Sequence, residues 1–119
     1  MGVVQLLLRA EWVALALGGV ALYLWLNGSW LLLVPLLLAI DLSMVGYLGG
    51  PRLGSITYNA AHNLVVALLA LGIGFWTGTA WLQLLAAVWV AHVGMDRSLG
   101  YGLKLPTDFR DTHLGRIGH

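Results

Sequence analysis

The sequence predicts an all-α polytopic membrane protein: a four-helix transmembrane bundle built from two tandem helical hairpins, with a short cytoplasmic C-terminal cap. Three observations support this prediction: an apolar composition, four long apolar runs, and positive charges on one side of those runs. The 119 residues are 60% hydrophobic and only 9% charged, whereas about 25% of the residues of a typical soluble domain are charged. A soluble fold of this length cannot bury that much apolar surface, so we expect lipid to surround much of it.

Each predicted span is an apolar run of about 20 residues, the length that crosses a hydrocarbon core of about 30 Å. Turn residues separate the runs at 27–29, 49–55 and 77–79. The runs lack the polar–apolar alternation of barrel strands, so we expect helices. The predicted spans are residues 10–26, 30–48, 56–76 and 80–99.

The six lysines and arginines lie in the two terminal segments, in the central loop and at the end of the last span, all of which four spans place on one side of the membrane. The two short loops on the other side carry no charge. The positive-inside rule therefore predicts a multi-pass protein of the bacterial inner membrane with both termini in the cytoplasm. Tryptophans beside the short loops predict an aromatic belt at the opposite interface, formed by Trp25, Trp30, Trp76 and Trp81.

Composition and charge also exclude several classes of function. A net charge of +1 gives no reason to expect a nucleic-acid partner. The absence of cysteine excludes disulfides and thiolate metal sites. No cationic stretch precedes the first apolar run, so we expect that run to be a span and not a cleaved signal peptide.

A shift of 51 residues aligns the two halves of the chain without a gap and places Trp25 and Trp30 on Trp76 and Trp81. We therefore predict a bundle over residues 1–102 that contains two copies of one hairpin, residues 1–51 and 52–102. The two copies would be related by a pseudo-two-fold axis along the membrane normal. A cytoplasmic tail follows over residues 103–119.

The same shift aligns two pairs of titratable residues within the spans: Glu11 with His62, and Asp41 with His92. At about 1.5 Å of rise per residue, all four lie about 16–21 Å from the tryptophan belt, in the cytoplasmic half of the membrane. Inward side chains at one level of a four-helix bundle converge on one site. We therefore expect one acid or imidazole from each helix to meet inside the bundle.

Three neighbouring residues are placed to support this layer. Asp96 follows His92 by four residues, a spacing that orients the imidazole, supplies another ligand or places a general base. Tyr58 and Asn59 precede His62 by about one helical turn and share its face. The polar layer is therefore expected to continue around His62 and His92.

The C-terminal tail has a composition that favours a folded cap over a plain basic anchor. Its glycines and the run 112–115 (THLG) indicate a segment that returns to the inner mouth of the bundle. His113 would act there as a catalytic group, a further ligand or a gate, and Arg97 would cover the same mouth. Arg52, Arg97 and Lys104 are placed to attract an anionic headgroup. A loose solvated tail is the alternative.

Two histidines and two carboxylates at one depth suit a divalent metal, either Zn, Fe or Mn. We interpret the layer as a metal site, with hydrolysis of a lipid or another membrane-delivered small molecule as the reaction. A haem held between His62 and His92 is less favoured, because two carboxylates lie nearby. The alternatives are a carrier or channel for protons or a cation, and a non-catalytic module in which the layer only locks the helices together. Small residues at Ala70, Gly74 and Gly78 leave room for a homodimer.

Several stretches carry a family resemblance: residues 41–47 (DLSMVGY), Tyr58 and Asn59 with His62, residues 92–97 (HVGMDR) with 100–104 (GYGLK), and residues 112–115 (THLG). Together they resemble a family of small bacterial membrane proteins known only as domain-of-unknown-function family 4260. The resemblance covers nearly the whole chain and implies no activity. The pattern is also loosely similar to membrane-bound metal-dependent hydrolases. The chain lacks their fuller histidine-rich motif, so this similarity concerns site chemistry alone.

Overall fold

The computed structural model describes residues 2–99, 111–112 and 114–116. These residues form five α-helices, one 3₁₀ helix and a pair of two-residue antiparallel strands, which confirms the all-α class. In chain order the elements are α1 (Val3–Trp25), α2 (Trp30–Ala39), η1 (Ile40–Gly49), α3 (Pro51–Ala61), α4 (Leu64–Thr77), α5 (Ala80–Leu99), β1 (Asp111–Thr112) and β2 (Gly115–Arg116).

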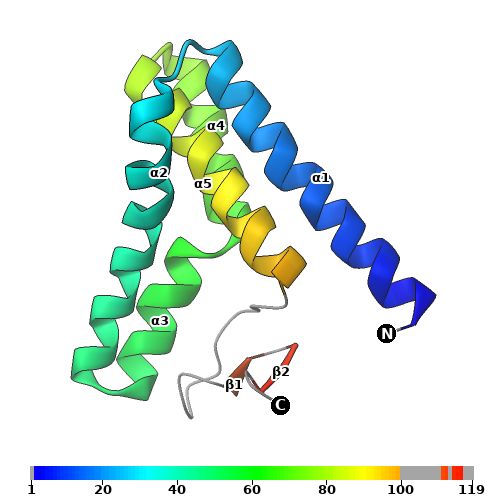
Figure 1. The fold of residues 1–119 in the computed structure, drawn as a ribbon. Helices are drawn as coiled ribbons and strands as arrows, with labels where there is room; N and C mark the ends of the chain where they lie inside the picture. Colours follow the sequence, from blue (N-terminus) through cyan, green and yellow to red (C-terminus); the bar gives the residue numbers. More distant parts are fainter. Residues whose placement is uncertain (1, 100–110, 113, 117–119) are drawn as a thin grey trace.

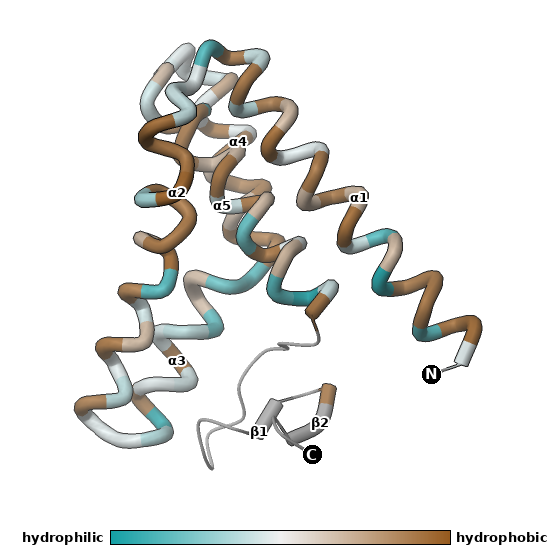
Figure 2. The backbone as a smooth tube through the Cα atoms, viewed as in Figure 1, coloured by the Kyte–Doolittle hydropathy of each residue, from teal (hydrophilic) through white to brown (hydrophobic). Residues whose placement is uncertain are grey.

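Helix α5 lies at the centre of the bundle and contacts α1, α2 and α4 (Figure 1). It holds more buried residues than any other helix. Helix α3 packs mainly against η1, and together they form a hairpin that extends from the bundle (Figure 1). Apolar residues dominate α1, α2, η1 and α4, whereas polar residues gather on α3 and at the C-terminal end of α5 (Figure 2).

Two helical segments in the described residues are long and apolar enough to cross a membrane: Val3–Trp25, and Trp30–Gly49, in which α2 continues into η1. A third candidate is the pair α3 and α4, which are bent by 42° at a short break. Four spans were predicted, so the structure supports two or three of them and association with a bilayer. Helix α5 has 20 residues but is more polar than these candidates. Neighbouring helices cover much of α5, so little of its surface would contact lipid and need to be apolar. The predicted orientation stays a prediction.

The predicted tandem hairpin repeat is not shown. Helix α1 is one continuous helix of 23 residues. The segment that the sequence shift aligns with α1 is instead divided into α3 and α4, because His62 has left helical geometry and the side chain of Asn63 accepts a hydrogen bond from the Val65 amide that starts α4. The two halves of the chain therefore follow different paths.

Small residues bring α1 and α5 into direct backbone contact. A Cβ atom added to Gly19 would lie 2.7 Å from the backbone nitrogen of Ala91, and one added to Gly94 would lie 2.7 Å from the backbone nitrogen of Ala16. The two backbones are therefore too close for any side chain larger than that of glycine. Small residues at helix interfaces allow this close approach in membrane proteins. The α1–α5 interface therefore depends on its glycines.

Adjacent glycines in α1 allow a matched test of this interface. Gly19→Ala should destabilise the protein by about 1–3 kcal/mol, since the new methyl group would overlap the α5 backbone. Gly18→Ala should be neutral or mildly stabilising, because nothing lies within 4 Å of its Cβ position and alanine favours the helix by about 1 kcal/mol over glycine. Thermal unfolding of the detergent-solubilised protein, followed by circular dichroism, measures both. Equal melting temperatures for the two variants would contradict the packing described here.

Candidate metal centre

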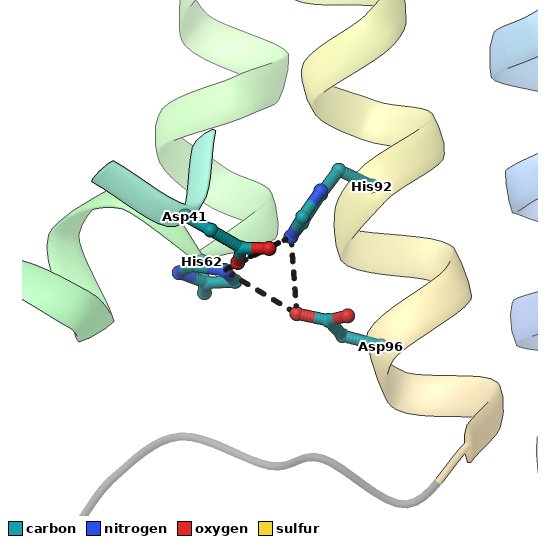
Figure 3. A group of neighbouring side chains, drawn as sticks. All are labelled: Asp41, His62, His92 and Asp96. Atoms are coloured by element: carbon teal, nitrogen blue, oxygen red, sulfur yellow. Dashed lines mark hydrogen bonds and ion pairs between the residues drawn. The ribbon is translucent and has the colours of Figure 1, made fainter. Parts of the chain in front are cut away.

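His62 lies in the break between α3 and α4. Its backbone has φ −105° and ψ 21°, so it terminates α3, and α4 begins two residues later at Leu64. The side chain of Asn63 accepts from the Val65 amide at 2.8 Å and so caps the new helix. This break directs the His62 ring into the space between η1 and α5 (Figure 3).

Two other elements bring the remaining polar side chains to the same place. Helix α2 tightens into the 3₁₀ helix η1 at Ile40, and Asp41 is the next residue. Helix α5 remains regular and presents His92 and Asp96 four residues apart on one face. Three segments distant in the sequence therefore converge at one level of the bundle.

The four side chains point toward a common centre (Figure 3). Each of Asp41, His62, His92 and Asp96 offers one ligand atom, and these four atoms all lie within 4.8 Å of one another. The two Nε2 atoms are 3.0 Å apart. Asp41 Oδ1 lies 3.1 Å from both Nε2 atoms, and Asp96 Oδ2 lies 3.3 Å from His62 Nε2 and 3.2 Å from His92 Nε2. A metal ion with bonds of about 2.0–2.2 Å keeps its neighbouring ligand atoms at about such separations.

The protonation of His62 suits a metal ligand. His62 Nδ1 lies 3.0 Å from the Tyr58 carbonyl oxygen, which can only accept, so Nδ1 carries the proton. In the neutral ring, Nε2 then presents a lone pair toward two carboxylate oxygens and the second imidazole. A cation between these atoms would be coordinated by this lone pair and by the carboxylate oxygens. A backbone hydrogen bond to the distal nitrogen is also the usual way in which a metal-binding histidine is oriented.

Burial of the group makes a nearby positive charge more favourable. The side chains of His62 and His92 are 1% and 2% exposed, and that of Asp96 is 13% exposed. Asp41 is 38% exposed and forms the open side of the group. Two carboxylates held together away from water are costly unless positive charge balances them. A divalent ion with two neutral histidines gives a centre with no net charge.

Tyr58 lines one side of this group. Its ring stacks on the His62 ring with centroids 3.8 Å apart and an interplanar angle of 7°. Its hydroxyl donates a long hydrogen bond of 3.5 Å to Asp96 Oδ2. Tyr58 therefore restricts the His62 ring and contacts a carboxylate from α5, consistent with the supporting role expected from the sequence.

The structure brings together three of the four residues predicted to form the layer: Asp41, His62 and His92. The fourth member of the group is Asp96, which the sequence placed beside the site as base, support or further ligand. Glu11 does not join the group; it lies on an exposed face of α1, which inclines away from α3 and η1 (Figure 1).

The remaining predicted residues have separate outcomes. Arg97 is buried and donates to the His62 carbonyl at 3.1 Å, so it lies beside the centre. Asn59 is half-buried on α3. His113 and Lys104 lie outside the described residues. Trp89 was not predicted: its indole N–H donates to the Ala61 carbonyl at the end of α3. Only the spacing of Trp89, three residues before His92, links it to the site in the sequence.

Residues 5–117 match a family described as Domain of unknown function (DUF4260). The chain belongs to the DUF4260 family. This match confirms the resemblance drawn from the sequence motifs. No curated protein and no solved structure matches the chain. In this DUF4260 member, the geometry of the site is therefore what indicates a function.

The sequence predicted Glu11 in the group and the structure has Asp96 there, and paired variants distinguish these two residues. Asp96→Asn should weaken Co²⁺ binding by more than about tenfold, because it removes a charged oxygen that points into the centre. Glu11→Gln should bind Co²⁺ as the wild type does, since Glu11 lies apart on α1. Titration of the purified protein with Co²⁺, followed by visible absorption, gives both affinities. The reverse order of effects would show that Glu11, and not Asp96, is the ligand.

Proposed function

We propose that the chain is a metal-binding integral membrane protein whose centre holds Zn²⁺, Fe²⁺ or Mn²⁺ through Asp41, His62, His92 and Asp96. The observation that carries the proposal is the convergence of these four ligand atoms within 4.8 Å of one another. Imidazole nitrogens and carboxylate oxygens are the donors that these ions prefer. We propose further that the centre lies in the cytoplasmic half of the inner membrane, with α5 as a fourth span shielded by its neighbours.

A metal-dependent hydrolase is the activity that we favour. A bound divalent ion would supply Lewis-acid activation of a substrate oxygen or a water. The residues of the chain would position the ion and admit the substrate, and the half-exposed Asp41 marks the side of entry. Iron and manganese accept more than four ligands, so they leave coordination positions free, whereas a zinc ion held tetrahedrally by all four residues would be structural.

The surface around Asp41 supports a lipid or another membrane-delivered molecule as the substrate. Leu42, Val45 and Leu48 on η1 are 69%, 61% and 90% exposed. In a 3₁₀ helix, residues three apart lie on one line, so these side chains form an apolar stripe. A substrate that reaches Asp41 along η1 passes this stripe, which suits an amphiphilic molecule better than a fully polar one.

A carrier for protons or a cation is the second candidate, favoured by one observation. The site lies at the break between α3 and α4, and discontinuous helices commonly form ion sites in transporters. Such a carrier would use the same four side chains but bind its cation transiently.

Metal content tests the resident metal centre on which the hydrolase proposal depends. Protein purified in detergent and reloaded with Zn²⁺, Fe²⁺ or Mn²⁺ should retain about one ion per chain through gel filtration, because four ligands replace the ion's hydration shell. His62→Ala should lose the ion. Elemental analysis by mass spectrometry measures this stoichiometry, with Arg52→Gln as a control on an exposed residue of α3. Wild-type protein that retains none of the three ions would reject a resident metal centre and leave the carrier or a structural polar network.

Reconstitution distinguishes hydrolysis from transport. Vesicles that contain the metal-loaded protein and a fluorogenic phospholipid should release the fluorophore, and Asp41→Asn should lower this rate by at least about a hundredfold because it removes a ligand at the entrance to the centre. The same vesicles, loaded with a pH-sensitive or metal-sensitive dye, should show no flux above protein-free vesicles. Flux that Asp41→Asn abolishes, without lipid cleavage, would favour the carrier instead.

A further inference from the structure

We propose that Trp89 and Arg97 are positioning residues of the metal centre, which hold the helix break from which His62 reaches the ion. The proposal rests on the metal-binding function above. It assigns to two α5 side chains a role that none of the four ligand residues performs.

The break at His62 creates a need for hydrogen-bond donors. The last carbonyls of an α-helix have no partner within the helix, and inside a membrane no bulk water replaces it. The Tyr58 carbonyl is occupied by the His62 amide at 2.8 Å and by His62 Nδ1. The carbonyls of Ala61 and His62 lie at the turn itself.

Helix α5 supplies a donor to each of these two carbonyls. The Trp89 indole N–H donates to the Ala61 carbonyl, and Arg97 Nη2 donates to the His62 carbonyl at 3.1 Å. Arg97 is only 8% exposed. Its guanidinium also lies over the Trp12 ring of α1, 5.8 Å from the centroid. The break is therefore joined to α5 directly and to α1 through Arg97.

The same stretch of α5 carries two of the ligands and both donors. Trp89 precedes His92 by three residues and Arg97 follows Asp96 directly, so all four project from about two turns of one regular helix. Within the described residues, α3 packs mainly on η1 and has no extensive contact with α5. Helix α4, which begins two residues after His62, packs against α5 on the far side of the break. The two hydrogen bonds join the break itself to the stretch of α5 that carries His92 and Asp96.

The test compares the Co²⁺-loaded protein with variants that remove one donor each. In Trp89→Phe the ring remains and the N–H is lost, whereas in Arg97→Gln the buried charge is lost. Each should weaken Co²⁺ binding by about 10–100-fold, the usual effect of losing a residue that orients a ligand. Each should also shift the visible absorption and electron paramagnetic resonance of the bound ion. Arg97→Lys should partly restore both, because an ammonium group can donate to the single carbonyl.

Trp81→Phe is the matched control, since Trp81 is on the same helix but 67% exposed, and it should bind Co²⁺ as the wild type does. Wild-type affinity and spectra in Trp89→Phe and Arg97→Gln would overturn the positioning role while leaving the metal site in place. Weaker binding with an unchanged spectrum, accompanied by a lower melting temperature of the metal-free protein, would also overturn it, because it would reveal a general loss of stability. Wild-type protein that binds no Co²⁺, Zn²⁺, Fe²⁺ or Mn²⁺ would reject the metal site and this inference with it.

Discussion

The concentration of negative charge between α5 and the η1–α3 hairpin is the constraint on which the rest of the structure depends. Asp41 and Asp96 each approach the same pair of imidazole nitrogens at 3.1–3.3 Å, and these nitrogens are buried. In an apolar environment two carboxylates in this position need compensation. Arg97 adds a buried positive charge at the position after Asp96, and a divalent ion would balance the two carboxylates. The helices are arranged so that the acids face each other and not the lipid.

Two local departures from α-helical geometry allow these side chains to meet. If residues 51–77 formed one regular helix, the direction of the His62 side chain would be fixed by the helical period of about 3.6 residues. The same would hold for Asp41 if α2 continued as a regular α-helix. The structure instead tightens the chain into a 3₁₀ helix at Ile40 and interrupts it at His62. Departures from α-helical geometry inside a span often accompany functional sites. Here each one lies at or next to a residue of the candidate metal group, while the regular helix α5 provides the fixed side of the site.

Sequence reasoning predicted the helical class, the family, and three members of the group because these depend on local patterns: apolar runs, motif residues, and distance along a helix from the flanking tryptophans. The fourth member was placed differently because the repeat alignment treats both halves as equivalent hairpins. That equivalence requires the helix that contains His62 to be as continuous as α1, and the Asn63 cap breaks it. Glu11 lies on α1 outside the group, and the fourth member is Asp96, which is one helical turn from His92. Helix α5 can also carry polar residues because neighbouring helices bury it. A hydropathy window averages over the sequence and contains no information about this burial.

The packing on the other side of the centre bears on the choice between hydrolysis and transport. About one turn from His92 along α5, Ala87 and Val88 pack with Tyr23 of α1 and Leu33 of α2 in a fully apolar cluster. The Tyr23 hydroxyl donates to the Ser29 carbonyl at 2.8 Å and so fixes the turn between α1 and α2 above this cluster. An ion moving from the centre toward that turn would have to separate these side chains and leave all of its ligands at once. Asp41, in contrast, already opens the centre on its own side. A site that is open at Asp41 and faces packed apolar side chains toward the α1–α2 turn suits the hydrolysis that we propose better than passage through the bundle.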